Sequence, residues 1–272
     1  MKKVSLIIGS CALALITSCK TAPSGALTPH TPYENLGRDG KIYAAFYQQR
    51  AAEYEALCLQ AYNIAKLRLD EALAQKSNQT LAIVSDIDET FLDNSYYAVE
   101  RAKMGKSYDQ KTWEEWTAKG IAKPLTGSQE FYQYAAEKGI QVFYVTNRTE
   151  SERAGTLKNL KKYNFPLQNE DNLIVRSTES SKETRRNDIA KNYHIVLLLG
   201  DNLADFSNIF DKKTEAERSS AVKNSAADFG KKFIIIPNVG YGDWESSFYK
   251  YKYDYTDQKK DSMMYEAVKT MP

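Results

Sequence analysis

The sequence predicts an α/β protein with a Rossmann-like parallel sheet that carries helices on both faces. Five short apolar runs alternate with amphipathic stretches of helical periodicity. These runs are nearly continuous in Val, Ile, Leu and Phe, which is typical of parallel strands covered on both faces. Several of the runs end in polar or acidic residues, and sheets of this kind bind ligands beyond the carboxyl ends of their strands.

The predicted elements occupy residues 41–272. A long helical pattern covers residues 41–75 and ends at turn-forming residues. The intervening amphipathic sequence predicts helices at 127–137 and 150–162, and the five strands are predicted at 81–84, 141–146, 173–176, 195–200 and 233–237. Residues 94–124 separate the first two strands, and we expect them to form a small, mainly helical cap together with the N-terminal helix.

The composition is that of a folded protein with a sizeable core. The chain has 272 residues, of which 42% are hydrophobic and 26% charged. Its formal net charge is only +2, and no long basic run is present. We therefore expect no nucleic-acid polymer as a partner.

The first 18 residues have the pattern of a signal peptide. Two lysines precede an apolar stretch, residues 4–16, that is too short to span a bilayer as a helix. The segment ending at Cys19 resembles the lipobox of bacterial lipoproteins, which implies that Cys19 is lipidated and that residues 19–40 are a lipidated terminus and linker. We then expect a lipid-anchored protein of the cell envelope, at the outer membrane. An ordinary signal cut near Ser18 and a plain membrane anchor are the alternatives.

The cysteine count agrees with export without an internal disulfide. Cys11 lies in the signal segment and Cys19 is the expected lipid site, so Cys58 is the one cysteine left in the body of the protein. Its neighbours are apolar at helical spacing, which predicts a small buried residue.

Acidic residues gather where the first predicted strand ends. The stretch IVSDIDETFLDN places Asp86 and Asp88 at that end, and Asp201 and Asp205 follow the fourth strand. Clustered carboxylates repel one another, so they persist together only with a compensating cation. Oxygen ligands without nearby His or Cys favour Mg²⁺ or Ca²⁺ over Zn²⁺. An EF-hand loop starting at Asp86 is excluded, because Phe91 stands where that loop needs Gly.

These motifs, in this order, resemble the haloacid dehalogenase superfamily of phosphotransferases. That superfamily carries D-x-D-x-T, a Thr or Ser after a second strand, a Lys and a terminal acidic pair, and the chain has all four. The segments IVSDIDETFLDNSYY and VLLLGDNLADF resemble the two signatures of class C acid phosphatases, bacterial lipoproteins of the lipoprotein e (P4) type. The resemblance implies a haloacid dehalogenase-like fold.

The resemblance also implies roles for the acidic residues. Asp86 would be the nucleophile that forms an aspartyl phosphate, and Asp88 the general acid and base. Mg²⁺ would be held by the carboxylates of Asp86 and Asp201 and by the main-chain carbonyl of Asp88. Asp205 would either bind the metal itself or hold one of its ligands in place. The alternative is that Asp205 is only an acidic residue near a helix N-terminus.

Three further residues match the phosphate-binding positions of the family. Thr146 and the backbone amide of Asn147 would bind phosphoryl oxygens, and Lys182 would neutralise the phosphate and the nucleophile. Thr146 could instead cap a helix, and Lys182 could be a solvated surface charge. The assignment of Lys182 also competes with nearby arginines, namely Arg176, Arg185 and Arg186.

Aromatic residues are the candidates for binding the leaving group. Trp113 and Trp116 lie three apart in the predicted cap, so they share a helix face that either packs on the core or stacks on a ring of the substrate. Tyr241 is a further candidate, as are Tyr96 and Tyr97. His194 leads into an apolar strand and is expected to be structural.

The expected function is that of a magnesium-dependent acid phosphatase. The resemblance implies small phosphomonoester substrates, namely nucleoside monophosphates and aryl phosphates, cleaved through an aspartyl phosphate. One alternative is a surface lipoprotein that binds a metal or a small ligand such as haem without turnover. Another is a phosphatase specific for sugar phosphates or phosphoprotein. A second copy of the chain, in a homodimer, is a further possible partner.

Overall fold

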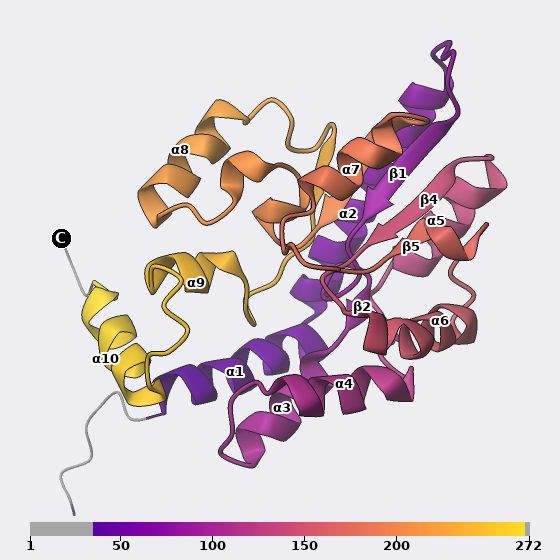
Figure 1. Ribbon diagram of the computed structural model, residues 1–272. Helices are drawn as coiled ribbons and strands as arrows, with labels where there is room; N and C mark the ends of the chain where they lie inside the picture. Colours follow the sequence, from indigo (N-terminus) through magenta and orange to yellow (C-terminus); the bar gives the residue numbers. More distant parts are fainter. Residues whose placement is uncertain (1–34, 270–272) are drawn as a thin grey trace, which may run out of the picture.

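The computed structural model describes residues 35–269, and it confirms the predicted α/β class. Five parallel strands form a sheet in the order β5-β4-β1-β6-β7 (Figure 1). Their bounds are β1 Leu81–Ser85, β4 Gln141–Val145, β5 Leu173–Ile174, β6 His194–Gly200 and β7 Phe233–Ile235. The central strand β1 pairs with both β4 and β6, so residues that follow β1 lie in the middle of the sheet edge.

Helices cover both faces of the sheet, because alternate strand residues bury their side chains on opposite sides. On one face, Ile83 and Val142 pack in the larger core with α2 (Ala52–Leu73), α5 (Ser128–Glu137) and α6 (Arg153–Lys162). On the other face, Val84 and Phe143 pack with α7 (Glu183–Ala190) and α8 (Glu215–Asn224). The short helices η2 Glu170–Asn172, η3 Leu203–Asp205 and η4 Asn208–Phe210 connect these layers.

The single helix predicted at 41–75 is wrong. The structure has two helices, α1 (Leu36–Arg50) and α2, which are separated at Ala51. Ala51 has an extended backbone with φ −89° and ψ 124°, although its N–H still bonds to the carbonyl of Tyr47 at 3.0 Å. The break lets α2 pack under the sheet while α1 turns to pack against α3, so tertiary packing overrides local helix propensity.

A mainly helical layer lies beyond the carboxyl ends of the strands, as the sequence predicts for residues 94–124. It contains α3 (Ser95–Lys103) and α4 (Gln110–Lys119), together with the short antiparallel pair β2 (Leu92–Asp93) and β3 (Lys123–Pro124). Helix α1 packs along α3, and α4 packs against α6 and η1 (Glu150–Glu152) (Figure 1). The layer thus faces the edge of the sheet where the acidic residues lie.

The C-terminal part of the chain adds two helices that the sequence did not predict, α9 (Asp243–Phe248) and α10 (Asp257–Ala267). Helix α10 packs against α1, and its Asp261 accepts a hydrogen bond from the backbone N–H of Gly37 at 2.8 Å. The two ends of the described chain therefore meet at the cap (Figure 1).

Cys58 is a free, fully buried cysteine on α2, as predicted. The expected signal peptide, Cys19 and the first part of the linker lie outside the described residues. Among residues 35–269, no helix combines the length and apolar character that crossing a bilayer requires.

Candidate active site

The polar side chains of the site follow the carboxyl ends of neighbouring strands. Asp86 comes directly after β1, Thr146 after β4, and Asp201 after β6, with Asn238 shortly after β7. Because the strands are parallel, these positions meet at one edge of the sheet. The backbone N–H of Asp86 bonds to the carbonyl of Leu199 at 3.0 Å, which ties the end of β1 to that of β6.

Lys182 lies between two of the predicted carboxylates. Its Nζ donates to Oδ1 of Asp86 and to Oδ1 of Asp205, the latter at 2.7 Å, and the side chain is only 5% exposed. Lys182 is therefore a buried cation beside Asp86, and a solvated surface charge is excluded. Its role toward a phosphate stays a prediction. The second oxygen of Asp205 accepts the backbone N–H of Asn202 at 3.0 Å, so both of its oxygens are engaged.

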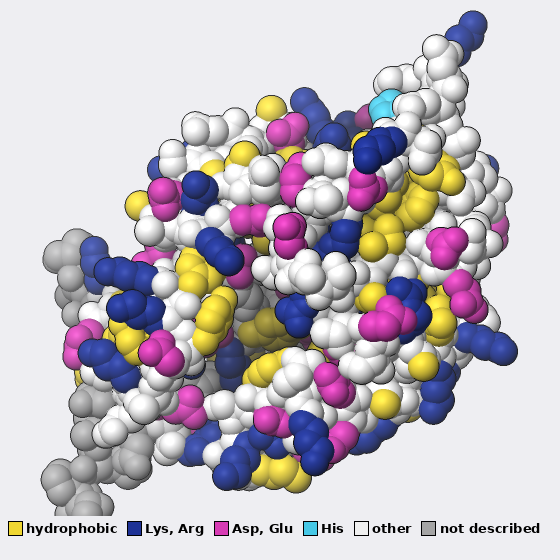
Figure 2. Space-filling view, in the orientation of Figure 1, with side chains coloured by type: hydrophobic (Ala, Val, Ile, Leu, Met, Phe, Trp, Pro, Cys, Tyr) yellow, Lys and Arg dark blue, Asp and Glu magenta, His cyan; other side chains and the backbone are white. Residues whose placement is uncertain are grey.

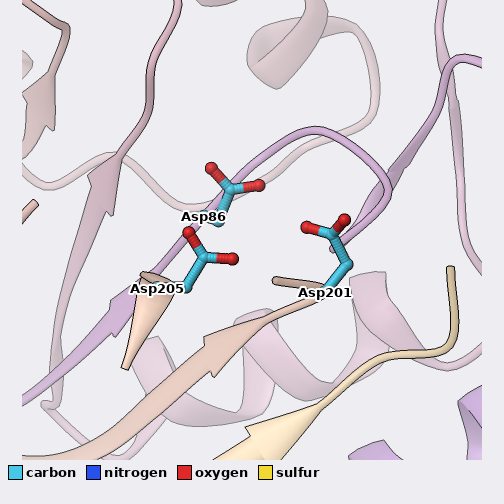
Figure 3. Close-up of side chains that lie close together, drawn as sticks. All are labelled: Asp86, Asp201 and Asp205. Carbon is cyan, nitrogen blue, oxygen red and sulfur yellow. The ribbon is translucent and has the colours of Figure 1, made fainter. Parts of the chain in front are cut away.

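Asp201 completes the acidic cluster. Oxygens of Asp86, Asp201 and Asp205 lie within 4.8 Å of one another, and the three side chains point toward a common space (Figure 3). The hydroxyl of Thr90 lies 3.2 Å from Oδ2 of Asp86 and 3.3 Å from Oδ1 of Asp201, so it can donate to either. Asn238 donates its amide to Oδ2 of Asp201 at 2.7 Å.

Thr90 and Asn238 therefore belong to the site, although sequence analysis assigned them no role. Thr90 is the threonine of the D-x-D-x-T motif, and Asn238 lies just after the last predicted strand. Their positions in a motif and at a strand end were the features of the sequence that could have indicated a role in the site.

Gly200 allows the two acids of the GDNLADF segment to come together. A Cβ at this position would lie 2.4 Å from both Cβ and Oδ2 of Asp205. Any side chain would thus push Asp205 away from Lys182, so glycine is required by close approach.

Burial and mutual repulsion both oppose negative charge in this cluster. Burial raises the pKa of Asp86 to about 7 against the opposing effect of Lys182, and Asp205 and Asp88 raise it further. Burial, with help from Asp205 and Asp86, raises the pKa of Asp201 well above its ordinary value. Burial alone would lower the pKa of Lys182, but Asp205 and Asp86 raise it overall. One lysine does not compensate three clustered carboxylates, of which Asp86 and Asp205 are buried and Asp201 is half-buried.

The donor set suits a hard divalent cation. All three side chains offer carboxylate oxygens, no histidine or cysteine belongs to the cluster, and Asp86 and Asp201 each keep an oxygen that only Thr90 contacts. Asp205 is held by Lys182 and Asn202, so it supports the cluster from one side. The expected contribution of the Asp88 main-chain carbonyl to a metal stays a prediction.

The side chain of Asp88 lies apart from the acidic cluster and is bound by Arg148. Nε of Arg148 lies 3.1 Å from each carboxylate oxygen and Nη2 lies 2.6 Å from Oδ1, while the arginine also donates to Thr156 at 2.9 Å. Asn94 donates to Oδ1 of Asp88 at 2.9 Å and in turn accepts the indole N–H of Trp116 at 2.8 Å. Oδ2 is consequently the less engaged oxygen of Asp88.

Arg148 and Asn94 are functional candidates that sequence analysis missed. Arg148 is 2% exposed, so it is a buried arginine whose charge is balanced by Asp88. The sequence signal was its position two residues after Thr146, at the end of a strand.

Thr146 and Asn147 lie at the same edge of the sheet, and phosphate binding by them stays a prediction. Thr146 is buried and accepts the backbone N–H of Arg148 at 3.1 Å, and Asn147 is exposed to the pocket. Arg185 binds the Thr146 carbonyl at 2.6 Å and the Asn147 side chain at 2.9 Å, so it shapes this turn. Arg186 binds the carbonyls of Ala204 and Asp205 at 3.1 and 2.8 Å and pairs with Glu183. Of these competing cations, Lys182 is the one paired with Asp86.

A pocket of about 660 Å³ opens over the acidic cluster. Figure 2 shows the hollow between the C-terminal helices and the α3–α4 layer. Trp113 and Tyr241 line it, and Tyr97 packs edge-on against Trp113 with ring centroids 5.2 Å apart. Substrate binding by Trp113 and Tyr241 stays a prediction. Trp116 does not line the pocket. Its ring is buried and its N–H orients Asn94, so the stacking role considered for it is wrong.

Glu89 connects the loop that follows β1 to the pocket wall. Its Oε1 accepts the backbone N–H of Asn94 at 2.7 Å, and its Oε2 accepts the hydroxyl of Tyr241. The residue has φ 56°, in the left-handed region that non-glycine residues seldom occupy. Burial, followed by the nearby charge of Asp88, raises the pKa of Glu89 to about 8.

The fold and this arrangement of acids define a phosphotransferase-type site of the haloacid dehalogenase kind, and the family comparison agrees. The family model for the HAD superfamily, subfamily IIIB (acid phosphatase), matches residues 18–244. The chain belongs to this family.

Similar proteins and structures are also acid phosphatases by name, with one exception. A class C acid phosphatase from Bacillus anthracis with tungstate bound is 39% identical, with a TM-score of 0.83 over 86% of this chain and 99% of that one. A second structure of the Bacillus anthracis class C acid phosphatase is 38% identical, with the same TM-score over 87% and 99%.

Two plant proteins are similar in part. Acid phosphatase 1 of Solanum lycopersicum is 30% identical over 45% of this chain and 50% of its own length. The stem 31 kDa glycoprotein of Glycine max is 27% identical over 44% and 49%. The match with this chain thus spans about half the length of these plant relatives.

Proposed function

We propose that this protein is a magnesium-dependent acid phosphatase that hydrolyses small phosphomonoesters through an aspartyl phosphate on Asp86. The observation that carries the proposal is the convergence of Asp86, Lys182 and two further carboxylates at one edge of the sheet, beside Thr146. Membership of an acid phosphatase family and the similarity to two class C acid phosphatases support it. The bound tungstate in one of those structures is a tetrahedral oxyanion, as phosphate is.

In the first step a carboxylate oxygen of Asp86 attacks phosphorus, and the bond from phosphorus to the ester oxygen breaks. Lys182 and the Thr146–Asn147 turn would hold the phosphoryl oxygens while this happens. Asp88 gives its proton to the departing oxygen, so the alcohol or phenol leaves neutral. The oxygen that would carry this proton is Oδ2, because it contacts only Nε of Arg148 at 3.1 Å, whereas Oδ1 binds both Arg148 and Asn94.

In the second step water attacks the phosphorus of the aspartyl phosphate. Asp88, now ionised, takes a proton from that water, and the bond from phosphorus to Asp86 breaks to release inorganic phosphate. Arg148 and Asn94 keep Asp88 oriented through both steps, since both of their contacts are to the same carboxylate.

Mg²⁺ is the cation we propose for the acidic cluster, with Asp86 and Asp201 as its carboxylate ligands. When bound it supplies positive charge that lets an anionic phosphate approach an anionic nucleophile. Asp86 and Asp201 are arranged to hold it, because each keeps an oxygen directed into the cluster.

Metal binding should be measurable without turnover. We expect Mg²⁺ at about 100 times its dissociation constant to raise the melting temperature of chelator-treated protein by about 5 °C or more. Asp201→Asn should remove most of this shift, whereas Asp171→Asn, at an exposed position away from the pocket, should keep it. Activity on p-nitrophenyl phosphate should disappear with chelator and return with Mg²⁺. Full activity after verified metal removal would contradict the metal proposal.

For the substrate we propose nucleoside monophosphates and aryl phosphates. The pocket wall beside the acidic cluster carries Trp113, Tyr97 and Tyr241, whose rings suit a flat aromatic leaving group. This wall favours such esters over sugar phosphates.

No observation favours a non-catalytic role, and no histidine or cysteine among the described residues lines the pocket as a haem ligand would.

We also propose that the protein is anchored to the cell envelope through a lipid on Cys19. The support is the sequence pattern before Cys19, which lies outside the described residues. We expect Cys19→Ser to abolish metabolic labelling with a fatty acid and to release the protein from the detergent phase, because the thiol proposed to carry the lipid is gone. Cys58→Ser, a change at a buried cysteine, is the control and should leave labelling intact. A labelled Cys19→Ser protein would place the anchor elsewhere.

A further inference from the structure

The outer end of the active-site pocket carries a group of cations that the proposed chemistry does not use. Arg38 from α1, Arg101 from α3 and Lys106 from the α3–α4 loop all line the pocket, as do Asp86 and Lys182 at its inner end. One continuous pocket therefore has positive side chains at both ends, and the aromatic residues Tyr97 and Trp113 also line it.

The fold holds these three cations close together. Nε of Arg101 donates to the carbonyl of Ser107 at 3.0 Å, and the backbone N–H of Lys106 donates to the carbonyl of Arg101 at 2.9 Å. Nη1 of Arg38 lies 3.4 Å from the place that a Cβ on Gly105 would occupy. The first turn of α1 thus meets the end of α3 with like charges facing one pocket.

No carboxylate among residues 35–269 forms an ion pair with any of the three cations. Asp109 acts on Arg101 only from beyond ion-pair distance, and two acids that line the same pocket have other hydrogen-bond partners. Asp261 accepts the backbone N–H of Gly37, and Asp257 accepts the hydroxyl of Ser107 at 2.7 Å. Arg38 and Arg101 are half-buried, so their charges are less screened than those on an open surface. Three cations that line one pocket without a carboxylate at ion-pair distance are suited to an anion.

We propose that Arg38, Arg101 and Lys106 form a second anion-binding subsite, which takes a phosphate carried by the leaving group of the substrate. The inference rests on the proposed phosphatase function and names its substrate class: phosphomonoesters whose leaving group bears a second phosphate, such as a nucleoside 3′,5′-bisphosphate. One phosphate lies at Asp86 and Lys182, the nucleoside lies along the aromatic wall, and the other phosphate is held by the guanidinium groups.

The test compares adenosine 3′,5′-bisphosphate with 5′-AMP and p-nitrophenyl phosphate. We expect Arg38→Gln/Arg101→Gln to lower kcat/KM for the bisphosphate about tenfold or more, mainly through KM, because two charged hydrogen bonds are lost in the bound state. The same variant should change kcat/KM for the two monophosphates less than about twofold. Lys103→Gln is the matched control, since it removes one charge from the same helix at an exposed position outside the pocket. It should leave the preference unchanged.

Equal losses for all three substrates would show general electrostatic steering and would overturn the subsite, as would no loss for the bisphosphate.

Binding is measured separately by calorimetry on Asp86→Asn protein, which should hold both nucleotides without cleaving them. There the bisphosphate should bind about tenfold tighter than 5′-AMP, and the double change should remove that difference. A parental protein that binds in this way but hydrolyses nothing would refute the phosphatase function and leave the subsite standing. Equal affinity for the two nucleotides would refute the subsite alone.

Discussion

Asp86→Asn is expected to lower kcat for p-nitrophenyl phosphate by a factor of about 10⁴ or more. The amide that replaces the carboxylate cannot attack phosphorus, so no aspartyl phosphate forms. It also withdraws one of the two negative partners of Lys182, although the contact with Asp205 at 2.7 Å remains. The measurement is steady-state phosphate release at saturating Mg²⁺, together with a search for labelled protein after acid quench.

The fold of the variant should persist, because the change keeps the shape of a buried side chain and removes a charge whose burial is unfavourable. A circular dichroism spectrum and a cooperative melt should match those of the parental protein. Asp171→Asn, an equivalent change at an exposed site, should retain full activity. Turnover near the parental rate in Asp86→Asn would assign the nucleophile to another residue.

Asp88→Asn is expected to slow the first turnover about a hundredfold or more for 5′-AMP and far less for p-nitrophenyl phosphate. An alkoxide leaves poorly without a proton, whereas nitrophenolate leaves without help. Dephosphorylation should slow as well, because no base remains to take a proton from water. With the aryl ester a phosphorylated enzyme should therefore accumulate, and rapid-quench measurements would detect it.

The contacts of Asp88 show which effects the change to asparagine should and should not have. Oδ1 of Asp88 accepts Arg148 and Asn94, and asparagine keeps an acceptor of the same length at that position. Only the 3.1 Å contact between Oδ2 and Nε of Arg148 is lost, and the same Nε still reaches Oδ1. The loss should then be chemical and not positional. Equal slowing of the first step for both esters would instead show that Asp88 acts by holding the loop, and the acid and base would have to be sought elsewhere.

Much of the fold could be predicted because a parallel sheet buried on both faces leaves a strong local signal. Its strands read as apolar runs, and the predicted run at 195–200 differs from β6 by a single residue at its start. The same reasoning located Asp86, Thr146 and Asp201, since the carboxyl ends of parallel strands meet at one edge. The roles of these residues came from the resemblance of their ordered motifs to one superfamily.

Other features had no local signal, because contacts between distant segments decide them. The break at Ala51 involves neither Pro nor Gly, and it exists because α1 packs on the cap while α2 packs under the sheet. Trp116 shares its helical spacing with Trp113, yet only the packing of α4 shows that one donates to Asn94 and the other faces the pocket.

The sequence by itself determined the class of fold, the sheet edge that carries the acids, and the chemistry that such a cluster requires. Periodicity and residue type depend on neighbours along the chain, so they can be read without coordinates. The tertiary structure alone decided which partners those acids have: Lys182 between Asp86 and Asp205, Arg148 on Asp88, and Tyr241 on Glu89. The partners in these pairs are 23 to 152 positions apart in the sequence. They meet only when the helices pack around the sheet.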